Sequence, residues 1–434
     1  MPEKLFIQNG HIVDPSQNID GNGDILIENG TIVSVDIRSA KSRTKTKPAP
    51  GGAQVFNAEG MYVVPGFIDM HVHLREPGFE HRETIETGTK AAVKGGFTSV
   101  CCMPNTSPVN DSDVVTDFIL KRAAETAACR VFPVGAITKG QKGEELAELG
   151  SMHDAGCIAF SDDGKTVMNS LIMRRALEYA KAFGAAMISH AEDVVLAEDG
   201  VMNEGAASAY FGLRGIPAAA EEVIVARDII LAQMTGGKVH IAHVSTKGSV
   251  ELIRRAKKDG VNITAETCPH YFTLTDMAVA GYNTAARVNP PLRSDEDVAA
   301  MKAGLADGTI DAVATDHAPH HRDDKLVEFD KALCGISGLE TALALSLQLV
   351  RDGVLTMPQL IAALSCTPAR ILGLPLGTLS AGAPADVTVF DPKPSWTVDS
   401  RQLISKGRNT PFHGMPVQGL PVMTIVAGSI AYSL

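Results

Sequence analysis

The chain has 434 residues, of which 45% are hydrophobic and 21% charged, and its formal net charge is −11. This length fits one barrel of the α/β type with a smaller accessory unit, and the negative charge argues against binding to nucleic acid or to an anionic membrane. The sequence has no run of about 18 apolar residues and no apolar signal segment, so we expect a cytoplasmic protein. Seven cysteines without paired CxxC spacing indicate reduced thiols.

The first sixty or so residues alternate apolar and polar side chains, a pattern typical of short strands. The segments LFIQNGHIVDP and DILIENGTIVSVD contain Asn9-Gly10 and Asn29-Gly30. Asn-Gly pairs accept positive φ values, so each pair predicts a β-hairpin turn.

Strand-like texture returns only near the C-terminus, in GAPADVTVFDP, SWTVD and VMTIVAGSIAYSL. We therefore expect residues 1–63 and 373–434 to form a small β-sandwich accessory domain together. Within it, residues 38–52 are rich in Lys, Thr, Pro and Gly and predict an exposed loop.

Residues 64–372 alternate strand and helix patterns. Eight apolar runs end in MHVH, SVCCMPN, RVFPVGA, CIAFSDD, AMISH, KVHIAHVS, NITAETCPH and DAVATDH. Segments such as DSDVVTDFILKRAAETA and AAEEVIVARDIILAQM lie between them, with apolar residues at helical spacing. Eight such units predict a catalytic (β/α)8 TIM barrel, with its active site at the C-terminal ends of the strands.

Candidate metal ligands stand at these strand ends. His71 and His73 are two residues apart on one strand, so both side chains face the same side and can chelate one ion. His190, His243 and Asp316 close three further strands. One histidine on a strand is as often structural as functional, and an aspartate before a turn commonly caps a helix. Several imidazoles and a carboxylate at neighbouring strand ends instead indicate Zn²⁺ or a similar ion that supports hydrolysis.

Two further positions bear on this site. His240 is three residues from His243, so we expect it to face the opposite side, against the helical layer, in a structural role. The fourth strand ends in Asp162 and Asp163, and either could bridge two ions. Neighbouring residues point to opposite faces, so only one should do so, and the other should hydrogen-bond the turn.

The motifs VVPGFIDMHVHLREPG, MPNT, SDDG, SHAED, IAHVST, AETCPHY, NPPLR and ATDHAPH together resemble the amidohydrolase superfamily and, within it, the bacterial class I dihydroorotases. The resemblance covers nearly the whole chain. It implies two zinc ions per subunit, one held by His71, His73 and Asp316 and the other by His190 and His243. It also implies that Asp163 and a hydroxide bridge them, where many superfamily members use a carbamylated lysine.

The same resemblance implies the substrate contacts. Arg75 would bind the substrate carboxylate through two parallel hydrogen bonds, a geometry that lysine cannot reproduce. The ordinary alternative is an ion pair between Arg75 and its neighbour Glu76. The other implied contacts are His73, Asn105, Asn289, His320, Cys334 and Gly335. Family members commonly have Phe-Gly where this chain has Cys334-Gly335, a departure that bears on substrate affinity.

The implied activity is dihydroorotase: reversible zinc-dependent hydrolysis of (S)-dihydroorotate to N-carbamoyl-L-aspartate in pyrimidine synthesis, with Asp316 as the catalytic proton carrier. One alternative is an allantoinase or hydantoinase, whose substrates lack the carboxylate that Arg75 would bind. Another is an inactive scaffold subunit for aspartate carbamoyltransferase, which would lack the metal ligands. The expected partners are a small-molecule substrate and a second copy in a homodimer, and association with aspartate carbamoyltransferase is compatible with activity.

Overall fold

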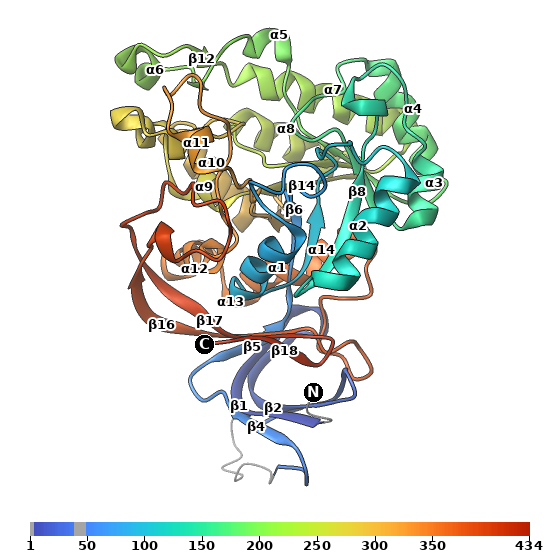
Figure 1. The fold of residues 1–434 in the computed structure, drawn as a ribbon, viewed down its shortest axis with the longest axis vertical. Coiled ribbons are helices and arrows are strands. Elements are labelled where there is room, and N and C mark those ends of the chain that lie inside the picture. Colours follow the sequence, from blue (N-terminus) through green and yellow to red (C-terminus); the bar gives the residue numbers. More distant parts are fainter. Residues whose placement is uncertain (1–3, 39–48) are drawn as a thin grey trace.

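The computed structural model describes residues 4–38 and 49–434. A barrel ringed by helices stands on a β-structure that contains both ends of the chain (Figure 1). Most of the loop predicted at 38–52 lies outside the described residues. No helix in the described ranges is long and apolar enough to cross a membrane.

Eight parallel strands form the barrel in chain order. They are β6 (Phe67–Val72), β7 (Phe97–Cys102), β8 (Arg130–Gly135), β9 (Ala159–Ser161), β10 (Ala186–Ser189), β13 (Val239–Ile241), β14 (Ile263–Thr267) and β15 (Ala312–Val313). A parallel bridge between Val72 and His317 joins the end of the last strand to the first. The predicted (β/α)8 barrel is confirmed, and each predicted strand is present.

A covering helix of 7 to 17 residues follows each barrel strand. These helices are α1 (Ile85–Lys94), α2 (Asp113–Thr126), α3 (Leu149–Ala155), α4 (Ser170–Ala180), α7 (Ala219–Thr235), α8 (Lys247–Lys258), α10 (Asp295–Ala306) and α12 (Ala342–Arg351). In α4, for example, Ile172, Ala176 and Ala180 are buried at four-residue spacing, and Asn169 caps the first turn through its side chain. The helical layer thus covers the barrel with the apolar stripes visible in the sequence.

Shorter elements occupy the connections. The loops of the barrel contain α5 (Val194–Ala197), β11 (Met202–Asn203), α6 (Ala206–Phe211), β12 (Gly215–Ile216), α9 (Pro269–Thr273) and α11 (Arg322–Lys325). After the barrel come α13 (Met357–Ile361), a π-helical turn (Ala362–Cys366) and α14 (Thr367–Leu372).

The accessory β-structure draws its strands from both ends of the chain. It contains β1 (Lys4–Asp14), β2 (Ile19–Glu28), β3 (Thr31–Ile37), β4 (Gln54–Asn57), β5 (Tyr62–Pro65), β16 (Val387–Thr397), β17 (Pro416–Val426) and β18 (Ser429–Ser433). Because β5 pairs with both β1 and β16, one sheet runs continuously from the N-terminal to the C-terminal strands. It encloses its own core, which includes Ile12, Ile25, Val387 and Ile425. The domain limits at residues 63 and 372 stay a prediction.

The two Asn-Gly pairs behave differently. Asn29-Gly30 forms the predicted hairpin turn between β2 and β3. The hairpin predicted at Asn9-Gly10 is wrong, because this pair lies inside β1, where the register with β2 shifts. Asn9 takes a φ of 64° there, so a β-bulge uses the same backbone tolerance as a turn. A Cβ on Gly10 would lie 2.4 Å from Cγ2 of Val63, and the glycine thereby allows β5 to pack closely.

Candidate metal centre and binding cavity

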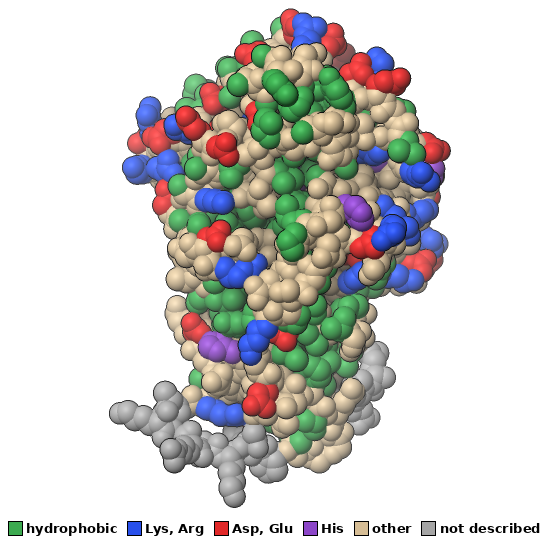
Figure 2. Space-filling model, turned by 90° about the vertical axis from the view of Figure 1, so that its left-hand side faces the viewer, with side chains coloured by type: hydrophobic (Ala, Val, Ile, Leu, Met, Phe, Trp, Pro, Cys, Tyr) green, Lys and Arg blue, Asp and Glu red, His purple; other side chains and the backbone are tan. Residues whose placement is uncertain are grey.

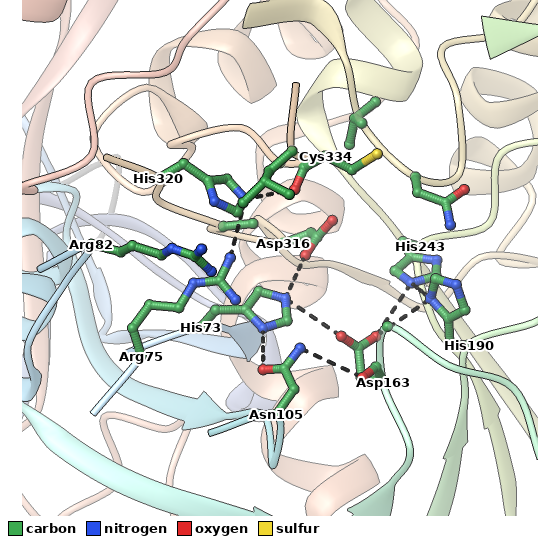
Figure 3. A pocket seen from close by; sticks show the side chains of 16 residues that line it. His73, Arg75, Arg82, Asn105, Asp163, His190, His243, Asp316, His320 and Cys334 are labelled. Atoms are coloured by element: carbon green, nitrogen blue, oxygen red, sulfur yellow. Dashed lines mark hydrogen bonds and ion pairs between the residues drawn. The ribbon is translucent and has the colours of Figure 1, made fainter. Parts of the chain in front are cut away.

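A cavity of about 330 Å³ opens at the C-terminal ends of the barrel strands (Figure 3). Its volume suits a small ligand. The sequence-predicted residues that line it are His73, Arg75, Asn105, Asp163, His190, His243, Asn289, Asp316, His320, Cys334 and Gly335. His71 does not line the cavity, but it is fully buried and contacts Asp163. Sequence reasoning missed Arg82, which also lines the cavity.

β6 delivers the first group of candidate ligands. Nε2 of His71 lies 3.2 Å from Oδ1 of Asp163, and Nε2 of His73 lies 3.5 Å from Oδ2 of the same carboxylate. Asp316 approaches from β15, with Oδ1 3.0 Å from Nε2 of His73 and 3.5 Å from Nε2 of His71. Burial lowers the pKa of His71, but the Asp163 and Asp316 carboxylates outweigh it and hold that pKa well above its usual value.

A second group shares Asp163 with the first. Nδ1 of His190 lies 3.6 Å and Nε2 of His243 lies 3.5 Å from Oδ1 of Asp163, and these two ring nitrogens are 2.9 Å apart. His190 follows β10 directly, whereas His243 follows β13 with a φ of 34° that turns the chain. Asp163 is thus the one carboxylate common to both groups of donor atoms found in the described part of the chain.

The donor set fits a divalent metal ion. Nε2 of His71 and Oδ1 of Asp163 are buried, and neither has a hydrogen-bond partner among the described residues. Buried polar atoms without partners are costly, and an ion held between them would satisfy both. Imidazole nitrogens and carboxylate oxygens are the donors that Zn²⁺ and related ions use in hydrolytic sites. The site can therefore hold a metal cofactor.

The two adjacent aspartates face different surroundings. Oδ1 of Asp162 accepts hydrogen bonds from the backbone N–H groups of Ile137 and Thr138, at 2.8 and 3.0 Å. Asp162 therefore braces the loop after β8, while Asp163 faces the histidines. Burial raises the pKa of both carboxyl groups. For Asp163 the neighbouring histidines outweigh burial and hold the pKa well below its usual value, whereas the pKa of Asp162 stays raised.

A buried network of polar side chains contacts His71 on the side of the ring opposite Asp163. Nδ1 of His71 donates to Oε1 of Glu266 at 2.9 Å, and Oε2 of Glu266 lies 3.3 Å from Nε2 of His240. Burial raises the pKa of Glu266, but the hydrogen bonds from His240 and His71 bring it to about 2. The only sequence signal for Glu266 was a carboxylate in the seventh strand.

The network corrects the prediction that His240 faces the helical layer. His240 reaches the interior network through Glu266, and its Nδ1 lies 2.8 Å from Oγ1 of Thr264. The strict alternation of strand side chains fails after His240 because His243 has a positive φ. His240 and His243, although three residues apart, can therefore both face the interior of the barrel.

Arg75 presents a buried guanidinium group to the cavity. Its Nε donates to the carbonyl oxygen of Pro319 at 3.2 Å, and its Nη2 lies 3.4 Å from Nε2 of His320. The alternative pairing with Glu76 does not occur, because Glu76 accepts from Nε of Arg122 at 2.7 Å. Burial lowers the pKa of Arg75 to about 10, so the group is charged at neutral pH. Figure 3 shows Arg75, Arg82 and His320 on one side of the cavity and His190 and His243 on the other.

The other predicted contacts have partners at the cavity wall. Oδ1 of Asn105 accepts from Nδ1 of His73 at 2.9 Å, and Nδ2 of Asn289 donates to Glu192 at 3.2 Å. Nε2 of His320 donates to the carbonyl oxygen of Cys334 at 2.7 Å. Burial and the Arg75 charge lower the pKa of His320 to about 2, so this ring is neutral. The following Gly335 has a φ of 147°, and a Cβ there would lie 2.9 Å from Nε2 of His320.

Comparison with known proteins assigns the chain to a family. A family model described as "Dihydro-orotase-like" matches residues 60–249. The chain is 56% identical over 428 residues to the dihydroorotase of Citrifermentans bemidjiense and 55% identical to that of Pelobacter propionicus, covering 99% of each chain. Among solved structures, L-hydantoinase from Arthrobacter aurescens superposes with a TM-score of 0.88 at 25% identity, covering 99% of this chain and 96% of that one. The chain therefore belongs to the dihydroorotase family.

Proposed function

We propose that this chain is a metal-dependent cyclic amidase that hydrolyses (S)-dihydroorotate reversibly to N-carbamoyl-L-aspartate, a step of pyrimidine synthesis. The observation that carries the proposal is Arg75, a buried cation that faces the cavity beside the metal-ligand candidates and is not paired with Glu76. A buried charge without a partner is costly, and the substrate carboxylate would supply that partner. Full-length relatives named dihydroorotase support the same substrate.

Arg75 also separates this activity from a second candidate. The superposed L-hydantoinase raises the option of a ring substrate without a carboxylate. Such a substrate would leave the guanidinium of Arg75 without a carboxylate partner in the cavity. An inactive scaffold subunit is disfavoured for a different reason, because five other candidate ligands converge around Asp163 in this chain.

For the cofactor, we propose two zinc ions. His71, His73 and Asp316 would hold one, His190 and His243 would hold the other, and Asp163 would contact both. Bound zinc supplies Lewis-acid polarisation of the scissile carbonyl and lowers the pKa of a water molecule so that it attacks at neutral pH.

The chain's own residues would bind and orient the substrate and would transfer the proton. Arg75 and His320 hold the carboxylate end of the ring, which fixes the amide carbonyl towards the histidines. Burial raises the pKa of Asp316, but His71 and His73 outweigh it and hold the pKa low, so the carboxylate is ionised and can accept a proton. Asp316 would accept the proton of the attacking water and deliver it to the leaving ring nitrogen. In the reverse direction it would return the proton as the ring closes.

We also propose a homodimer. Val223, Ile230 and Met234 lie on one face of α7 and are 48%, 63% and 55% exposed, an apolar stripe that a second copy would cover. Light scattering tests the dimer, and mixing with aspartate carbamoyltransferase tests that association.

On the face shown in Figure 2, Lys and Arg side chains are interspersed with Asp and Glu, which favours a small-molecule substrate over nucleic acid.

The decisive experiment measures metal content and dihydroorotate hydrolysis on the same preparation. We expect about two zinc ions per chain and turnover of dihydroorotate that greatly exceeds turnover of hydantoin or allantoin. Removal of the metal by a chelator should abolish turnover, and added Zn²⁺ should restore it. A metal-loaded protein that hydrolyses hydantoin but not dihydroorotate would contradict the proposal.

A further inference from the structure

A segment of the accessory β-structure reaches the mouth of the barrel. The chain between β16 and β17, residues 398–415, leaves the sheet and runs up beside the barrel (Figure 1). Several of its side chains are buried, including Ser405, Asn409 and Phe412. This burial shows that the segment packs into the barrel wall rather than lying on its surface.

Asn409 uses its whole amide group at this contact. Nδ2 donates to the carbonyl oxygens of Ala318 at 3.0 Å and Gly335 at 2.9 Å. Oδ1 accepts from the backbone N–H of His320 at 2.9 Å and from Oγ of Ser337 at 3.0 Å. A carboxamide has two donor hydrogens and two acceptor lone pairs, so every hydrogen-bonding position of this side chain is filled.

The four partners belong to two loops of the binding cavity. One loop contains Pro319 and His320, and the carbonyl oxygen of Pro319 receives Nε of Arg75. The other contains Gly335, which lines the cavity beside His320. Asn409 therefore ties the loop that contacts the guanidinium of Arg75 to the neighbouring loop that contains Gly335.

Gly407 of the same segment packs closely against the loop that contains Pro319. A Cβ on Gly407 would lie 2.4 Å from Cβ of Pro319, so the backbone approaches the loop as closely as a glycine allows. Oγ of Ser337 also lies 2.9 Å from the carbonyl oxygen of Gly407, so its single proton is shared between this oxygen and Oδ1 of Asn409. The segment thus fixes the loops both by packing and by hydrogen bonds.

We propose that Asn409 is a positioning residue for the carboxylate-binding half of the active site. It touches no metal-ligand candidate and does not line the cavity, and it acts through His320, Gly335 and the carbonyl that orients Arg75. This inference rests on the proposed function, in which that half of the cavity binds the substrate carboxylate. The accessory β-structure thereby contributes to substrate binding without contacting substrate.

The test compares Asn409→Leu with a matched variant, Asn110→Leu. Asn110 is also fully buried, with Nδ2 donating to the carbonyl oxygen of Val134 at 2.9 Å and Oδ1 accepting from Thr116 at 2.8 Å, but it does not line the cavity. Leucine has a similar size and no charge, so neither variant adds an electrostatic effect near the substrate. KM, kcat, zinc content and the melting temperature are measured for each.

We expect Asn409→Leu to raise KM for dihydroorotate by about 10-fold or more, because small misplacements of binding groups are costly. Zinc content should stay at the wild-type value, and Asn110→Leu should lower the melting temperature without raising KM. A milder variant, Ser337→Ala, removes the hydroxyl that Asn409 and Gly407 share and should raise KM by about 3-fold.

Three results would overturn the inference. One is an Asn409→Leu protein with unchanged KM and a melting temperature lowered as in Asn110→Leu. If Asn409→Leu does not fold, unchanged KM in Ser337→Ala decides against the inference. Absence of dihydroorotate turnover by the unaltered chain would overturn the proposed function, and this inference with it.

Discussion

Oε1 of Glu266 lies 2.9 Å from Nδ1 of His71 inside the barrel, and both side chains are fully buried. The carboxylate accepts the proton on Nδ1 of His71 and orients the ring so that Nε2 points towards Asp163, 3.2 Å away. A carboxylate behind a metal-binding histidine orients the ring and increases its basicity.

Replacement of Glu266 should therefore weaken metal binding. We expect Glu266→Gln to lower zinc affinity by about 10-fold to 100-fold, measured by competition with a chromophoric chelator. Glu221→Gln is the control, because Glu221 is equally buried but accepts from the backbone N–H groups of Ser245 and Thr246. Equal zinc affinity in the two variants would show that Glu266 does not act on the metal site.

The two aspartates after β9 should have separable roles. We expect Asp163→Ala to lose most of its bound metal and all measurable turnover, because both groups of candidate ligands contain this carboxylate. Asp162→Ala should keep its metal and lose about 1–3 kcal/mol of stability, because the backbone N–H groups of Ile137 and Thr138 lose their acceptor. Metal analysis and denaturant unfolding test both; metal loss in Asp162→Ala alone would reverse the assignment.

Arg75 should be required for the substrate carboxylate in particular. We expect Arg75→Ala to abolish dihydroorotate turnover and Arg75→Lys to lower kcat/KM by about 100-fold, because lysine cannot form two parallel hydrogen bonds to a carboxylate. Both variants should retain zinc, since Arg75 is not among the candidate ligands. Preserved turnover in Arg75→Ala would refute the carboxylate contact.

His270 should make the folded protein sensitive to mild acid. Burial lowers the pKa of this ring to about 4, whereas an unfolded chain has a histidine pKa of about 6.5. Between these values the unfolded chain binds a proton that the folded chain does not, so stability falls as the pH decreases. The expected loss is about 1.4 kcal/mol per pH unit below about 6.5 from this group.

The matching experiment compares the wild type with His270→Phe at pH 7.5 and pH 5.5 by denaturant unfolding. The variant should lose less stability on acidification than the wild type, whatever its stability at pH 7.5. Equal losses in the two proteins would mean that His270 is not held neutral by the fold.

Periodicity and motif spacing predicted much of this molecule. The eight apolar runs became the eight barrel strands, because a strand buried on both faces needs a continuous apolar segment. The strand ends placed His71, His73, His190, His243 and Asp316 at one face of the barrel, since parallel strands end on the same side. These features depend only on local sequence and on the handedness of the fold.

Other features depend on backbone details that residue patterns do not encode. Strand alternation predicts the wrong side for His240, because His243 has a positive φ that interrupts the alternation of side chains. The Asn9-Gly10 pair predicts a turn where the structure has a bulge, because both require the same conformational tolerance. In each case the sequence signal was compatible with two local geometries, and neighbouring strands selected one.

The sequence by itself predicted a TIM barrel with candidate metal ligands at the strand ends and with Arg75 beside them. Only the tertiary structure decided which residues support that site. Asp162 and Asp163 are chemically identical, and their different contacts separate them. Glu266 and Asn409 lie 195 and 89 positions from the residues His71 and His320 that they hold. No local pattern specifies contacts at such separations, because they form only when the barrel closes and the accessory segment packs against it.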